Sequence, residues 1–216
     1  MRIGWRVAVI VVLAVAGACT SGGGTGSGPG SADSSSAEDA IAAFDLRHAA
    51  LAESLAAVNE SAFADPDSMR EAALASLEAD DPARRFAAVY ALTLTVSTDV
   101  PDSLDAIREV MASGDPTERF LAAGALASLG DPDAVAMLIE ALGSDEPMHY
   151  LAPPMPAWRY ARANLLLFVG QDLGLRGATD AAAAAAAGEA WRAWWSENAQ
   201  AMTWNGELGR FDGPAQ

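Results

Sequence analysis

The sequence predicts an all-α fold, a right-handed α-solenoid of about four stacked helix pairs. Three observations within residues 115–142 lead to it. Apolar side chains recur at helical spacing on two consecutive segments, with Gly130 between them. Each segment begins with Asp followed by Pro, at Asp115 and Asp131, which is typical of a capped helix start. A pair of short amphipathic helices cannot bury its apolar faces alone, so it needs similar pairs on either side.

Related segments occupy most of the chain. The segment 81–94 matches 115–126 at an offset of 34 residues, and Arg159 lies 40 residues beyond Arg119. The same reasoning predicts five further helices, at residues 38–59, 65–77, 101–113, 157–169 and 179–199. Alternation around Asn205-Gly206 predicts a small β-hairpin at 202–211. Gly124 interrupts a predicted helix at a cost of about 1 kcal/mol relative to Ala, which indicates close approach of another helix.

The composition of the chain limits the functions that it can have. The 216 residues are 51% hydrophobic, enough for one folded domain. The formal net charge is −16, and all thirteen basic residues are arginine. An acidic chain of this kind is repelled by phosphate backbones, so we expect no nucleic-acid partner.

The amino terminus has the pattern of a processing signal. Arg2 and Arg6 precede an apolar run, and the small residues Ala16, Gly17 and Ala18 directly precede Cys19. This pattern resembles the lipobox of bacterial lipoproteins, although Ala16 stands where that family usually has Leu. The resemblance implies a signal peptide at residues 1–18 and lipidation of Cys19, with palmitate among the attached chains. An ordinary signal peptide with an incidental Cys, or an uncleaved membrane helix, are the alternatives.

A lipidated Cys19 has consequences for the rest of the chain. It is the only cysteine, so no intrachain disulfide can form. Residues 19–37 then comprise the lipidated cysteine and a flexible Gly/Ser-rich tether, followed by the solenoid at 38–200 and a tail at 201–216. We expect a membrane partner through the lipid anchor, on the extracytoplasmic side of the cell membrane or outer membrane of a bacterial envelope.

The repeated residues resemble HEAT repeats. The shared pattern is Asp-Pro-x-x-Arg, Ala-Ala-x-Ala-Leu, Gly-Asp-x-x-Ala and Leu, and the nearest subtype is the short form first associated with phycobilisome lyases. Residues 170–198 also resemble the carboxyl-terminal ending of many bacterial HEAT-repeat proteins, in which tryptophans look like a packing cap. The resemblance implies a shape and a protein-binding role, and no reaction.

The chain has few of the side chains that enzymes commonly use for catalysis. The chain has no lysine, no cysteine beyond Cys19, and two histidines without metal-ligand spacing. We therefore predict a non-enzymatic protein without cofactor or metal. An enzyme with an unrecognised carboxylate site is the alternative from another class.

The proline-rich insertion at 145–156 is the best candidate for contact with a partner, because it is the single irregular segment in the array. Its candidate residues are Met148, His149, Tyr150 and Met155. The insertion, taken as 145–160, also supports an alternative function, a small-ligand or metal-binding envelope lipoprotein, since Met and His are soft ligands that attract copper.

Other conspicuous residues have structural explanations. The aspartates at Asp-Pro starts are expected to cap helices rather than bind calcium. Trp191, Trp194 and Trp195 share one helix face and are expected in the core, with an exposed binding patch as the alternative. Recurrent arginines at 85, 119 and 159 are expected to bond neighbouring carboxylates or helix-end carbonyls. The sequence as a whole predicts a lipid-anchored extracytoplasmic scaffold that binds an unidentified protein through its stacked second helices.

Overall fold

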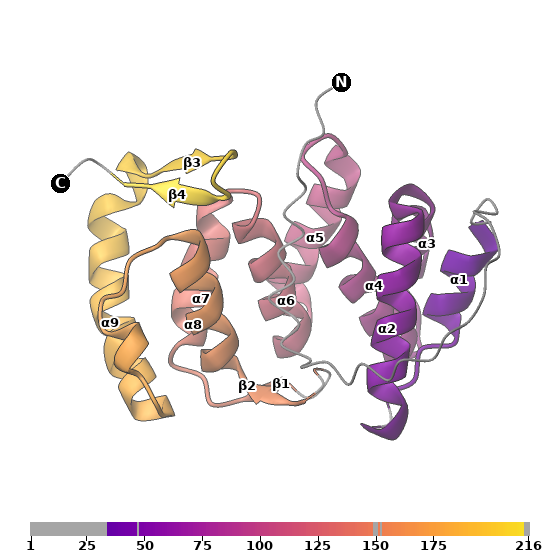
Figure 1. Ribbon diagram of the computed structural model, residues 1–216, viewed down its shortest axis with the longest axis horizontal. Helices are drawn as coiled ribbons and strands as arrows, with labels where there is room; N and C mark the ends of the chain where they lie inside the picture. Colours follow the sequence, from indigo (N-terminus) through magenta and orange to yellow (C-terminus); the bar gives the residue numbers. More distant parts are fainter. Residues whose placement is uncertain (1–33, 47, 149–150, 152, 214–216) are drawn as a thin grey trace, which may run out of the picture. The chain divides into compact units, whose positions relative to one another are not determined.

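The computed structural model describes residues 34–213 except 47, 149–150 and 152, and in this part of the chain the fold is all-α with two small strand pairs (Figure 1). The predicted fold class is therefore confirmed. The described chain divides into two compact units, an amino-terminal unit that ends at Thr95 and a carboxy-terminal unit that begins at Val96.

The amino-terminal unit contains four helices among its described residues: α1 Ser34–Ala42, α2 His48–Ala64, α3 Pro66–Ser76 and α4 Pro82–Thr95. Helix α3 packs against α4 and α1, and α2 contacts the other three. Helix α1 begins inside the segment predicted as tether, which extended to residue 37. The prediction of one helix over 38–59 was wrong, because the chain leaves the helix after Ala42 and α2 begins at His48.

The break after α1 has a packing cause. Phe44 lies in the connecting segment, is 6% exposed, and places its ring 5.7 Å from the ring of Phe86 in α4. The backbone N–H of Asp45 donates to Ser54 Oγ at 3.1 Å. Apolar residues recur through the break at helical spacing, so the period alone did not reveal it.

The carboxy-terminal unit contains five α-helices among its described residues: α5 Pro101–Ser113, α6 Pro116–Ala127, α7 Pro132–Ala141, α8 Ala157–Phe168 and α9 Ala181–Asn198. Helix α6 packs against α5, α7 and α8, and α7 also contacts α8 and α9. Two 3-10 turns, η1 Leu175–Gly177 and η2 Ala199–Ala201, flank α9. These helices agree with the predicted segments to within a few residues.

The last two helices are joined differently from the others. Trp158, at the start of α8, packs with Ala178 and Ala184, and Ala184 belongs to the first turn of α9. Helices α8 and α9 therefore begin at the same end of the unit. Residues 169–180 carry the chain back along α8, and Arg162 Nη2 in that helix donates to the carbonyl oxygen of Arg176 at 3.2 Å.

Two antiparallel strand pairs complete the described chain. Strands β3 Thr203–Asn205 and β4 Arg210–Asp212 form the predicted carboxy-terminal hairpin, with Trp204 opposite Phe211. This hairpin contacts α8 (Figure 1). Trp204 lies against Gly130 in the α6–α7 turn. The second pair, β1 Pro147–Met148 and β2 Met155–Pro156, forms the stem of the proline-rich insertion.

Close packing at Gly124 is confirmed. A methyl group at Gly124 would lie 2.9 Å from Cζ of Tyr160 and 3.2 Å from Oδ1 of Asn164, and closer still to the Tyr160 hydroxyl. Both partners belong to α8, so the glycine allows α6 and α8 to approach each other.

Candidate functional site

The structure places two of the four predicted partner-contact residues. Met148 is 1% exposed and Met155 is half-buried, and they face each other in the β1–β2 pair. The buried side chain of Met148 therefore offers no contact surface in this conformation. His149 and Tyr150 lie outside the described residues, as does Cys19, so partner contact by the insertion and lipidation both remain predictions.

The stem of the insertion is fixed by main-chain hydrogen bonds. The N–H of Ala157 donates to the carbonyl oxygen of Glu146 at 2.9 Å, and the N–H of Trp158 donates to that of Ser144 at 3.1 Å. The insertion is thus joined to the start of α8. Within the part of the chain that the structure describes, no three His, Cys, Asp or Glu side chains come together as metal ligands.

The aspartates at helix starts act as caps, as predicted. Asp115 accepts from the N–H of Glu118 at 3.0 Å while Glu118 accepts from the N–H of Asp115, which is a capping box. Asp131 accepts from the N–H groups of Asp133 and Ala134.

One of the three recurrent arginines bonds a helix-end carbonyl, and a second bonds a carbonyl in the loop after a helix. Arg85 Nη1 donates to the carbonyl oxygen of Ala79 at 3.3 Å, just past α3, and Arg119 Nε donates to that of Met111 at 3.1 Å, in the last turn of α5. The last carbonyls of a helix such as α5 have no intrahelical partner, so the Arg119 guanidinium satisfies one of them. The third arginine differs, because Arg159 lies over the ring of Trp158 at 5.2 Å.

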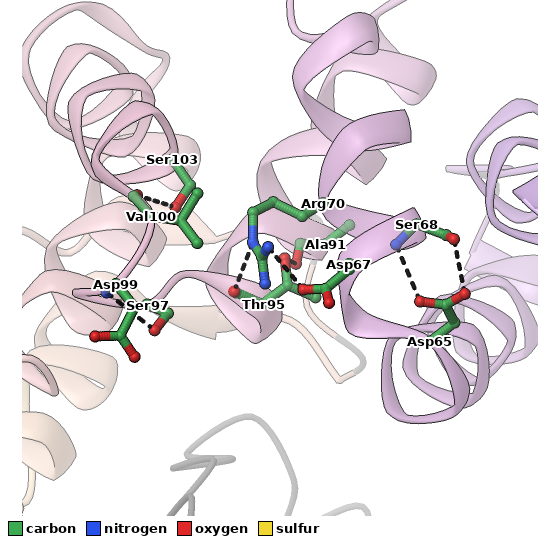
Figure 2. A network of polar contacts seen from close by, with 10 residues as sticks. All are labelled: Asp65, Asp67, Ser68, Arg70, Ala91, Thr95, Ser97, Asp99, Val100 and Ser103. Carbon is green, nitrogen blue, oxygen red and sulfur yellow. Dashed lines mark hydrogen bonds and ion pairs between the residues drawn. The ribbon is translucent and has the colours of Figure 1, made fainter.

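Sequence reasoning missed a further arginine of this kind. Arg70 in α3 is 7% exposed, and its Nε donates to the carbonyl oxygen of Thr95 at the end of α4, at 3.2 Å (Figure 2). Its Nη1 pairs with Asp67 at 2.8 Å. Arg70 lies in α3, a second helix of the repeat pattern, and is not part of the Asp-Pro-x-x-Arg motif. Comparison of the repeats therefore did not single it out.

The tryptophans belong to a packed end of the carboxy-terminal unit. Trp191 is fully buried, Trp195 is 7% exposed, and Trp194 is half-buried between them. The Trp195 and Trp204 rings lie 5.9 Å and 5.1 Å from the ring of Phe211 in β4. This arrangement supports the predicted packing cap over the alternative of an exposed aromatic patch.

Charge is distributed unevenly over the carboxy-terminal unit. From Val96 to Pro156 the chain has eleven acidic residues against two arginines, a formal charge of −9, whereas from Ala157 to Gly213 it has six against five, −1. Five of these eleven acids lie on α5 and α7. We define the acidic face by five exposed side chains of these two helices, Asp102, Asp105, Glu109, Asp133 and Glu140.

The two helices of the acidic face are joined by one ion pair. Arg108 in α5 reaches Asp131 Oδ2 at the start of α7 with its Nε at 3.2 Å, and its Nη1 lies 3.5 Å from Asp105 Oδ1. Helices α6 and α8 carry no exposed acid, because Glu118, 4% exposed, is the single carboxylate in either. The acidic face therefore belongs to the second helices of the repeat pattern.

Comparison with known families agrees with this architecture. Residues 70–148 match the family model described as HEAT repeats, and the chain therefore contains a HEAT-repeat domain. Searches of curated proteins and of solved structures gave no match. HEAT repeats commonly mediate protein–protein interaction and typically form non-enzymatic scaffolds.

Among the described helices, none is both long enough and apolar enough to span a bilayer.

Proposed function

We propose that this protein is a lipid-anchored, extracytoplasmic scaffold that binds a protein partner without catalysing a reaction. The observation that carries the proposal is the HEAT-repeat match over residues 70–148, together with the exposed second helices α5 and α7 within that range. Stacked helix pairs present extended surfaces to partners, and few side chains in this chain remain for chemistry.

Membrane attachment is the second part of the proposal. Its support is the sequence alone, in which the arginines, apolar run and small residues precede Cys19. Two acyl chains give stable anchoring because each buried methylene contributes about 0.8 kcal/mol. The test is metabolic labelling with radioactive palmitate. Wild type should incorporate label and Cys19→Ala should not, whereas equal labelling of both proteins would refute lipidation.

Partner binding is tested in the cells that make the protein. The full-length chain carries an affinity tag at its carboxyl end and is crosslinked in place with formaldehyde before purification. One protein species should be enriched in stoichiometric amounts over a control lipoprotein of the same expression level. Failure to enrich any protein, while the tagged chain itself is recovered folded, would refute the scaffold proposal.

A further inference from the structure

Arg162 in α8 has a donor that the fold leaves without an acceptor. Its Nε is the only buried side-chain nitrogen or oxygen without a hydrogen-bond partner among the residues that the structure describes. Its Nη2 donates to the carbonyl oxygen of Arg176 in η1 at 3.2 Å. A buried donor without an acceptor costs free energy, and native structures retain few of them. Stability therefore does not explain the position of this Nε, whereas a ligand that accepts its hydrogen bond would.

The edge of the guanidinium that carries Nε has the geometry of an oxyanion site. Nε and Nη2 present two parallel N–H groups on this edge, which match two oxygens of a carboxylate or a phosphate. The Arg176 carbonyl has one oxygen and bonds Nη2 but not Nε. It therefore occupies half of a two-donor site, and an oxyanion on the same edge would satisfy both donors.

Positive charge surrounds this edge in a chain whose net charge is −16. Arg159 lies three residues before Arg162 on α8, a spacing that makes side chains neighbours, and Arg176 lies on η1. None of these three arginines forms an ion pair with a carboxylate in the described part of the chain, and α8 contains no acidic residue. Both carboxylates in the connection from α8 to α9 accept main-chain hydrogen bonds. Asp172 Oδ1 accepts from the N–H of Arg176 at 2.7 Å, and Asp180 caps α9.

We propose that the Nε–Nη2 edge of Arg162 binds a phosphate group, and that the peptide between Arg176 and Gly177 flips to admit it. The flip removes the Arg176 carbonyl from the guanidinium and turns the Gly177 N–H toward the ligand. It moves the φ angle of Gly177 to positive values, which glycine adopts without steric cost. The hydrogen bond given up, from the Gly177 N–H to the Gly174 carbonyl, is long at 3.2 Å.

The surroundings of Gly177 allow this movement. No other part of the chain lies within 4 Å of a methyl group placed on Gly177, so neighbouring side chains leave room for the peptide to turn. A phosphate suits the resulting site better than a carboxylate does, because its third oxygen accepts from the Gly177 N–H and its larger charge matches several arginines. This site is independent of the scaffold proposal.

The phosphate group can belong to a soluble molecule or to a phospholipid headgroup, and both present the same oxygens to Arg162. The test therefore uses two probes, inorganic phosphate and neutral-detergent micelles that contain phosphatidic acid. Binding of each probe to the full-length protein is measured by isothermal titration calorimetry in the same detergent and at constant ionic strength. Wild-type binding to inorganic phosphate indicates a soluble ligand, and binding to phosphatidic acid alone indicates a headgroup.

Four variants test the two parts of the proposal. Arg162→Gln removes the guanidinium, and Arg162→Lys keeps the charge without the two-donor edge. Arg192→Gln is the matched control, because it removes one positive charge from α9, where Arg192 pairs with Glu189 at 2.7 Å. Gly177→Ala opposes the flip, because a residue with a Cβ atom disfavours positive φ. Melting by circular dichroism shows whether each variant is folded.

Wild type should bind at least one probe, both Arg162 variants should bind it about tenfold more weakly, and Arg192→Gln should stay within about twofold of wild type. Gly177→Ala should weaken binding by about five- to thirtyfold, the range that corresponds to the cost of a left-handed residue other than glycine. If Arg162→Gln does not fold, Arg162→Lys and Gly177→Ala still decide the outcome.

Three results would overturn the site: no binding by wild type, unchanged binding by the Arg162 variants, or equal weakening by Arg192→Gln. Unchanged binding by Gly177→Ala would overturn the peptide flip. The crosslinking experiment tests the scaffold proposal separately, since capture of a protein partner does not depend on phosphate.

Discussion

Replacement of Gly124 by alanine tests the contact between α6 and α8. A helix-interior Gly→Ala change is normally stabilising by about 1 kcal/mol, because alanine has the higher helix propensity. At Gly124 the added methyl group would meet a buried tyrosine, with Cζ of Tyr160 at 2.9 Å and the hydroxyl closer still. Tyr160 is 5% exposed and cannot swing into solvent without exposing its ring.

The expected magnitude follows from these two opposing effects. Overpacking of a well-packed core costs about 1–3 kcal/mol, and a contact this short belongs at the upper end of that range. After the propensity gain is subtracted, Gly124→Ala should destabilise the protein by about 2 kcal/mol. For a chain of this size the melting temperature should fall by about 4–8 °C.

The assay is thermal and urea unfolding by circular dichroism, with Tyr160→Phe as the second arm of a double-mutant cycle. Removal of the hydroxyl should reduce the cost of alanine by about 1 kcal/mol, since the closest contact disappears. Gly177→Ala is the matched control, because no atom lies within 4 Å of its added methyl group. Stabilisation by Gly124→Ala, or an equal cost in both tyrosine and phenylalanine backgrounds, would refute the packing argument.

Two further predictions concern stability. Leu126 is fully buried in α6, so Leu126→Ala should lower the free energy of unfolding by about 2–5 kcal/mol, measured in urea; unchanged unfolding would show that the side chain is not in the core. At Asp65, hydrogen bonds from the Ser68 side chain and backbone lower the carboxyl pKa from its ordinary value of 3.8. The ionised Asp65 cap stabilises the folded protein fully above the pKa that this carboxyl has in the unfolded chain. This stabilisation is lost as the pH falls through the lower pKa of the folded protein. Asp65→Asn retains a capping oxygen but does not titrate, so its melting temperature should fall less than that of wild type between pH 6 and pH 3; parallel pH profiles would contradict this.

The local features of the fold could be predicted from the sequence because their causes lie within a few residues. Asp115 and Asp131 cap their helices through hydrogen bonds to N–H groups two or three positions ahead, so the Asp-Pro pattern suffices to locate them. The hairpin at Asn205-Gly206 depends on turn residues in the same way. The break after Ala42 escaped prediction because Phe44 leaves the helix to reach a ring 42 positions along the chain, and helical spacing continues across the gap.

The candidate surface was predicted only in outline. The sequence identified the second helices as the contact surface and the insertion as its irregular neighbour, but it did not separate exposed acids from buried ones. Glu118 and Glu140 are the same residue type, and burial in the capping box distinguishes the first from the second. Met148 likewise has the composition of an exposed loop residue, and pairing with Met155 places it in the core.

By itself, the sequence determined most of the helical segments, where most of them begin, and that they recur as pairs, since capping and periodicity are local properties of the chain. It also determined that Gly124 needs a close neighbour. Only the tertiary structure decided that the neighbour is Tyr160, that Arg119 bonds a helix-end carbonyl instead of a carboxylate, and that Glu118 is buried while Glu140 is exposed. Each of these depends on which residues distant in sequence meet in space, and the packing of side chains between helices sets that.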